Sequence, residues 1–151
     1  MWWEIPRHLE IKQGELSIAG KRASDLAEKF GTPLYVYNGK RVAEIYRNFY
    51  STLKKYTDKE VRVHYAMKAN TNLELLKTLN KEGAWADAVS PEEAERAIEA
   101  GFPVDKILYN GVSASNEDLK KISSLGIMIN IDSVSELRRL KKIKPRTIAH
   151  S

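Results

Sequence analysis

Four short apolar runs recur in the last two thirds of the chain, at residues 61–67, 85–89, 106–109 and 127–131. Each is rich in β-branched or aromatic residues, and each is followed by a segment whose apolar positions have helical spacing. The runs end about 20 residues apart, which is the length of a compact βα unit. The pattern therefore predicts an α/β fold in which about four βα units form a parallel sheet.

The segments between these runs carry helix start and stop signals. A serine at the predicted N-cap is followed three residues later by an acidic residue, in the pairs Ser90/Glu93, Ser115/Asp118 and Ser133/Glu136. This spacing is typical of a capping box, and glycines at positions 83, 101 and 126 are typical helix stops. A further helix is predicted over residues 40–56, with helical spacing through Val42, Ile45 and Phe49.

The first 37 residues have a different pattern. Two alternating runs flank Gln13-Gly14, which predicts a β-hairpin, and residues 23–31 predict a short amphipathic helix closed by Gly31. The apolar segment 32–38 then predicts another strand. We interpret residues 1–37 as an N-terminal β element of a second domain, joined to the βα series of residues 38–151.

The βα series is compatible with two architectures. A doubly wound open sheet can be built from four or five strands, whereas an eight-stranded barrel needs about 250 residues. If the series belongs to a barrel, the 151 residues contain only its N-terminal half.

Composition narrows the class of protein. The chain is 42% hydrophobic and 30% charged, as in ordinary soluble globular proteins. No apolar stretch approaches the roughly 20 residues that cross a bilayer, and the start lacks a signal-peptide pattern. The absence of cysteine excludes disulfides and thiolate sites and favours a cytoplasmic protein. We therefore expect no membrane partner.

The net charge of +5 raises the question of a nucleic-acid partner. Much of the excess lies in residues 137–146, where basic residues alternate with Leu137, Leu140 and Ile143 at helical spacing. This alternation indicates a solvated helix face opposite a core face. No aromatic residues are interleaved as a stacking platform, so we expect no nucleic-acid binding.

Candidate chemistry lies where strands end and helices begin, because both βα architectures place their sites there. Lys68 ends the first run, in VRVHYAMKAN. By position alone a solvated lysine is favoured over one that forms an imine with a cofactor. Asp87, one βα unit later, could neighbour Lys68 across adjacent strand ends, and Glu93 is already explained as a helix cap.

Other chemistries find no support in the sequence. There is no glycine-rich phosphate loop and no serine nucleophile elbow. His8, His64 and His150 lack the spacing of metal ligands, and we expect a structural role for His64.

Five motifs together resemble the diaminopimelate decarboxylases. They are GTPLYVY (31–37), HYAMKAN (64–70), the segments 83–101 and 107–122, and GIMINIDSVSELRRL (126–140). They occur in the order and spacing of that family, which is one of the pyridoxal-phosphate decarboxylases with an alanine-racemase-like barrel. That wider group includes ornithine and arginine decarboxylases.

The resemblance implies a partial (β/α)₈ TIM-type barrel with N-terminal strands from a second β domain. It implies that Lys68 holds pyridoxal 5'-phosphate through an imine, with Asp87 and Glu93 near that lysine as cofactor contacts. The expected reaction is decarboxylation of meso-diaminopimelate to lysine, in an enzyme that is a homodimer at full length. The substrate class is a small amino acid, and ornithine, arginine or carboxynorspermidine decarboxylation is the alternative.

The resemblance is also incomplete. The family's later motifs, which include its phosphate-binding turn, are absent, and His150 stands where the family has an arginine. We therefore expect an incomplete site in this chain. A non-catalytic fragment that acts through oligomerisation is the further alternative.

Overall fold

The computed structural model describes residues 4–143. The chain divides into two compact units, and the division falls between Ile45 and Tyr46. It lies inside helix α2 (Gly39–Lys54), a few residues beyond the boundary at 37/38 that the sequence pattern indicated. Each unit is described by itself below. Within residues 4–143, no helix is long and apolar enough to cross a membrane.

The first unit contains a small antiparallel sheet. Strands β1 (Leu9–Lys12), β2 (Glu15–Ile18) and β3 (Lys21–Arg22) pair in that order. The β1–β2 turn places Gln13 and Gly14 at φ 52° and 82°, a left-handed pair typical of two-residue hairpins. The predicted hairpin is thus confirmed. Helix α1 (Ala23–Phe30) follows and ends at Gly31, as predicted.

The predicted strand over residues 32–38 is wrong. Residues 34–37 have no strand partner within residues 4–143, and they are exposed, with Tyr35 at 86%. A strand needs a neighbour that accepts and donates its backbone hydrogen bonds. Alternation of apolar residues indicates a preference for extended backbone, and the described part of the chain supplies no partner for it.

Helix α2 is confirmed, although its apolar positions are not all buried. Ala43 and Tyr46 are 7% and 8% exposed, whereas Ile45 and Phe49 are 52% and 55% exposed. The helix therefore carries apolar residues on more of its surface than the described residues cover. Spacing identified the helix correctly and did not identify its buried face.

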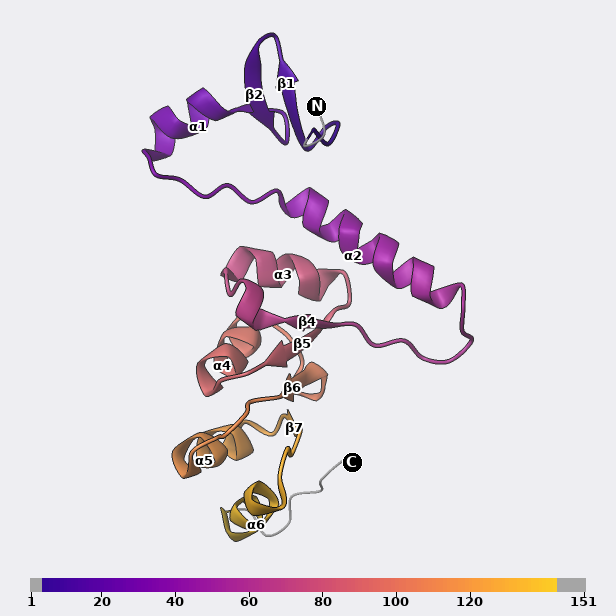
Figure 1. The fold of residues 1–151 in the computed structure, drawn as a ribbon, viewed down its shortest axis with the longest axis vertical. Helices are drawn as coiled ribbons and strands as arrows, with labels where there is room; N and C mark the ends of the chain where they lie inside the picture. The colour runs from indigo at the N-terminus through magenta and orange to yellow at the C-terminus, as the bar shows by residue number, and fades with distance from the viewer. Residues whose placement is uncertain (1–3, 144–151) are drawn as a thin grey trace. The chain divides into compact units, whose positions relative to one another are not determined.

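The second unit contains the predicted βα series (Figure 1). Its four parallel strands pair in chain order and are β4 (His64–Ala66), β5 (Trp85–Ala88), β6 (Ile107–Tyr109) and β7 (Met128–Ile129). The helices that follow them are α3 (Leu73–Lys81), α4 (Pro91–Glu99), α5 (Asn116–Leu125) and α6 (Val134–Ile143). Short 3₁₀ turns occupy Met67–Ala69 and Val104–Lys106.

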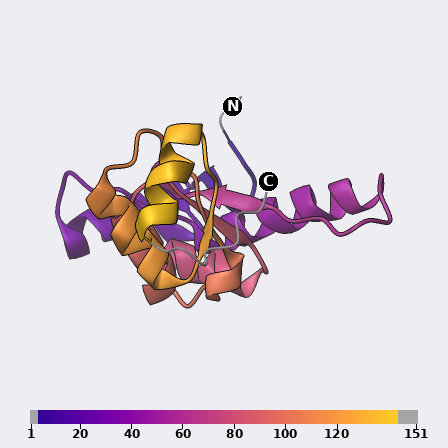
Figure 2. The ribbon, with the colours of Figure 1, turned by 90° about the horizontal axis from the view of Figure 1, so that it is seen from below.

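The helices lie side by side along one face of this sheet (Figure 1), and each of α3 to α6 contacts the next. Figure 2 views the stack from its α6 end. Small side chains allow this close approach, because Ala86 and Ala88 of β5 and Ala94 and Ala97 of α4 are fully buried. In α6 the predicted core position Leu140 is buried, whereas Leu137 is 43% exposed.

The serine caps are confirmed, and the acidic partners follow two patterns. At α5 the Asp118 carboxylate accepts from the Ser115 N–H at 2.9 Å, which is a complete capping box. At α4 and α6 the carboxylates of Glu93 and Glu136 accept from the residue before the serine, at 2.8 and 3.1 Å. Glutamate is one methylene longer than aspartate, so it reaches one residue further back.

Replacing Gly111 with alanine tests the packing beyond β6. A Cβ there would overlap the Tyr109 ring and hydroxyl and lie 2.8 Å from the Val89 carbonyl oxygen. We expect Gly111→Ala to lower the free energy of unfolding by about 1–3 kcal/mol in urea titrations, because backbone atoms must move. Gly83→Ala is the control. A Cβ there meets no atom within 4 Å, so the only cost is the strain of an alanine at the φ of 88°. A smaller loss at Gly111 than at Gly83 would contradict the overlap.

Candidate functional site

The register of the parallel sheet gathers polar residues at the carboxyl ends of its strands. Ala66, Asp87, Leu108 and Met128 are paired in one row across the four strands. Side chains alternate along a strand, so this row lies on the face opposite the buried Ala86 and Ala88. It is the face that the helices α3 to α6 leave uncovered.

The next position on the same face carries amide side chains. Asn110 and Asn130 each lie two residues beyond the paired row, directly after β6 and β7. The Asn130 Nδ2 donates to the Asn110 Oδ1 at 2.8 Å, so the two strand ends do bring these groups together. Neighbouring βα units therefore contribute together to the polar character of this edge.

Lys68 lies at the end of β4, in the middle of the 3₁₀ turn Met67–Ala69. Met67 is fully buried and anchors the turn, whereas the Lys68 side chain is exposed. No hydrogen bond or ion pair joins Lys68 to another of the residues between 4 and 143. The turn thus presents a free primary amine at the sheet edge.

The backbone around Lys68 runs directly into the next helix. Asn70 Oδ1 accepts from the Asn72 N–H at 2.8 Å. The Asn72 side chain then caps α3 by accepting from Glu74 and Leu75 N–H groups, at 3.1 and 3.2 Å. The lysine turn is consequently tied to a helix N-terminus rather than to a loose loop.

Asp87 lies on β5 directly opposite Ala66 of β4. Ala66 precedes Lys68 by two residues in the chain. Its Oδ1 is buried and has no hydrogen-bond partner in the described part of the chain. An orphaned buried carboxylate oxygen is costly, and such groups are commonly completed by a ligand, a cation or a missing neighbour. The sheet therefore places the Asp87 carboxylate oxygen, a hydrogen-bond acceptor without a donor among the described residues, beside the strand that leads into the turn of Lys68.

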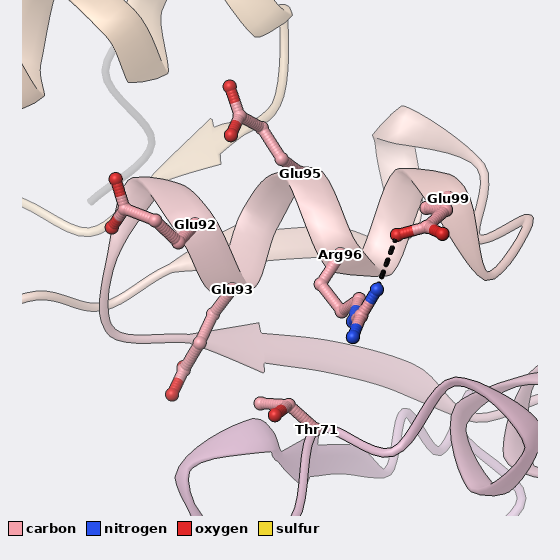
Figure 3. A pocket seen from close by; sticks show the side chains of 6 residues that line it. All are labelled: Thr71, Glu92, Glu93, Glu95, Arg96 and Glu99. Atoms are coloured by element: carbon pink, nitrogen blue, oxygen red, sulfur yellow. Dashed lines mark hydrogen bonds and ion pairs between the residues drawn. The ribbon is translucent and has the colours of Figure 1, made fainter.

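Glu93 is half-buried in the first turn of α4, and one carboxylate oxygen is used by the Val89 N–H. In Figure 3 its side chain points toward the segment of Thr71, whereas Glu92 and Glu95 point away. The residues around it line an open cavity of about 540 Å³. Glu93 is thus a helix cap on the side of α4 that faces the segment after the lysine turn.

That cavity is acidic, but its charges are largely paired. Glu99 accepts from Arg96 at 2.8 Å (Figure 3), and Lys121 pairs with Glu92 and Glu95 at 3.2 and 3.0 Å. The cavity therefore carries no sign of a cationic ligand. In the part of the chain that the structure describes, the Lys68 amine and the Asp87 Oδ1 at the strand ends are among the polar groups without a partner.

Two further polar residues, His64 and Glu136, have buried side-chain atoms. His64 lies 5.2 Å from the Trp85 ring, centroid to centroid, which fits a structural role, although its Nδ1 is buried without a partner among the residues described. Glu136 is only 1% exposed, and burial raises the pKa of its carboxyl group. Its spacing identified it as a cap, but no feature of the sequence indicated that it would be buried.

Comparison with known proteins identifies the family. The family described as "Pyridoxal-dependent decarboxylase, pyridoxal binding domain" matches residues 42–150. The chain belongs to this family. The βα series is accordingly part of a TIM-type barrel, as the resemblance implied, and the family's cofactor is a pyridoxal group.

Its relatives include many diaminopimelate decarboxylases. The enzyme of Methanothermobacter thermautotrophicus is 43% identical over 88% of this chain and 31% of its own length. The enzyme of Aquifex aeolicus is 39% identical over 93% of this chain and 32% of its own length. The chain therefore spans about a third of the length of these relatives.

Solved structures agree with this relationship. The diaminopimelate decarboxylase of M. jannaschii has a TM-score of 0.83 at 38% identity, over 89% of this chain and 32% of that one. The same enzyme in complex with L-lysine gives 0.84 at 38% identity, over 90% and 32%.

The buried Glu136 predicts a pH-dependent stability. Burial raises its pKa above 4.5 and outweighs the hydrogen bond from the Asp132 N–H, which acts in the opposite direction. The stability that neutral Glu136 contributes is fully present below the pKa of the unfolded chain and is lost as the pH rises through the higher folded value. Glu136→Gln stays neutral and keeps an acceptor for Asp132. We expect its urea midpoint to lack this fall.

The control is Glu117→Gln, which changes an exposed glutamate of α5. It should show the same pH profile as the unaltered chain. If Glu136→Gln also follows that profile, Glu136 does not titrate as its burial requires.

Proposed function

We propose that this chain supplies the cofactor-binding lysine of a pyridoxal-phosphate-dependent decarboxylase that converts meso-diaminopimelate to lysine. The observation that carries the proposal is the free amine of Lys68 at the carboxyl edge of the sheet, in a chain of this family. The substrate is favoured by relatives with 31–43% identity that are named diaminopimelate decarboxylases. A solved relative that contains L-lysine further supports an amino-acid ligand.

Lys68 and Asp87 are the groups of this chain that fit the cofactor. As an exposed primary amine, Lys68 would hold pyridoxal phosphate covalently through its Nζ. The orphaned Asp87 Oδ1 can accept a hydrogen bond from a protonated nitrogen at that position. When bound, the cofactor supplies the electron sink for loss of carbon dioxide.

Each residue then has a defined task. Lys68 would hold the cofactor and, once displaced from it by the substrate amine, would move a proton at its Nζ. Asp87 favours the charged form of a nearby nitrogen through its carboxylate. Glu93 holds the Val89 N–H and so orients the loop after β5, on the side of α4 that faces Thr71. Glu93 therefore supports the site through the backbone.

A different substrate within the group is the second candidate. A lysine/ornithine decarboxylase of Vibrio vulnificus has a TM-score of 0.69 at 25% identity, over 81% of this chain. The same βα units thus occur in relatives whose names give other substrates. Identity favours diaminopimelate, since the M. jannaschii enzyme reaches 38%. We further propose a cytoplasmic location, which fits a chain without cysteine, and a homodimer for the full-length enzyme, which the resemblance to the family implies.

Labelling with pyridoxal phosphate tests the assignment of Lys68. We expect weak, reversible uptake, because the chain has no phosphate-binding glycine turn. Borohydride reduction followed by peptide mass mapping should place the label at Lys68, and Lys68→Arg should abolish it. Lys77→Arg, on α3, is the matched control and should leave the labelling unchanged. Stable labelling at other lysines but not at Lys68 would refute the proposal.

The uncovered face of the sheet predicts association. In the part of the chain that the structure describes, β4 and β7 each pair on one side only. Edge strands and half-buried apolar residues such as Leu108 and Met128 favour contact with further strands. We expect the 151-residue chain to oligomerise, as measured by light scattering after size exclusion. A monodisperse monomer with one sharp thermal transition would contradict this expectation.

A further inference from the structure

Two residues that flank the lysine turn (Met67–Ala69), Tyr65 and Asn70, are joined by a hydrogen bond. The Tyr65 hydroxyl donates to the Asn70 carbonyl oxygen at 3.1 Å, and Lys68 lies between them in the chain. Tyr65 is paired with Ala86 in the sheet, on the face that the helices cover. The Tyr65 side chain therefore leaves β4 on the opposite face from Asp87 and fastens the turn from that side.

Asn70 is fixed by three separate hydrogen bonds. Its N–H donates to the Met67 carbonyl at 3.0 Å, which closes the 3₁₀ turn. Its own carbonyl accepts from Tyr65, and its side chain accepts from the Asn72 N–H. Asn70 is thus the point at which strand, turn and helix are tied together.

A turn of this kind needs such support. A 3₁₀ turn of three residues has a single internal hydrogen bond of modest strength. A lysine side chain adds a flexible stem of four carbons, so the position of its amine depends on how the turn is held. Met67, fully buried, anchors one end of the turn. The Tyr65 hydroxyl anchors the other end, so the direction in which Lys68 leaves the backbone is determined by two points.

We propose that Tyr65 is a positioning residue for Lys68. Its hydroxyl holds the turn so that the amine stays at the sheet edge beside the strand of Asp87. The inference rests on the proposed role of Lys68 as the cofactor-binding lysine. Tyr65→Phe keeps the ring and removes the only donor to the Asn70 carbonyl that the described residues provide. Loss of an ordinary hydrogen bond corresponds to roughly a fivefold effect.

The test compares two lysines within one sample. The 151-residue chain is incubated with pyridoxal phosphate at a series of pH values, reduced with borohydride and mapped by mass. The measured quantity is the label at Lys68 divided by the label at Lys77. We expect Tyr65→Phe to lower this ratio roughly fivefold at each pH. Tyr46→Phe, which alters a buried tyrosine of α2, should leave the ratio unchanged.

General loss of structure would also make the two lysines alike, so the ratio is compared only between variants whose circular dichroism matches that of the unaltered chain. An equal ratio in Tyr65→Phe and the unaltered chain overturns the positioning role while the proposed function stands. No preference for Lys68 in the unaltered chain overturns both. Should Tyr65→Phe not fold, Tyr65→Met removes the same hydroxyl and fills the space with a flexible apolar side chain, and it should also lower the ratio. An unchanged ratio in a folded Tyr65→Met overturns the inference.

Discussion

The hydrogen-bonded register between β4 and β5 is the constraint on which the candidate site depends. It places Ala66 opposite Asp87, and therefore puts the aspartate beside the strand that leads into the turn of Lys68. A slip of one residue would turn Asp87 toward the helices, among fully buried alanines such as Ala94. An ionised carboxylate cannot be buried there without a partner, so packing and electrostatics both require the observed pairing.

The N-termini of the helices lie at the same edge of the sheet. Many of the polar side chains at this edge are hydrogen-bonded to backbone N–H groups of those N-termini. Glu93, Asp118 and Glu136 each accept a backbone N–H near the start of the helix that carries them. Asn110 and Asn130 pair with each other. What remains without a partner in the described chain includes the Lys68 amine and the Asp87 Oδ1. Lys68 and Asp87 are therefore available to a ligand at an edge where the neighbouring Asn110, Asn130 and Asp118 side chains are engaged in structural hydrogen bonds.

Among the described residues, helices cover only one face of the parallel sheet. Small residues of β5 and α4 allow the helices to pack closely, whereas the opposite face holds Asp87, Leu108 and Met128 at intermediate exposure. A parallel sheet is normally covered on both faces or closed into a barrel. The uncovered face is consistent with a partial barrel. So is the length of the match, since the chain covers 32% of the M. jannaschii structure.

The sequence by itself determined the succession of βα units, the hairpin at Gln13-Gly14 and the serine caps, because these follow from local periodicity and local hydrogen bonding. Its motifs also singled out Lys68. Only the tertiary structure decided that, among residues 4–143, the segment 34–37 has no strand partner and the Asp87 Oδ1 has no hydrogen-bond partner, and that Ile45 and Phe49 are exposed. Those properties depend on which distant segments lie alongside, and periodicity within one segment contains no information about its neighbours.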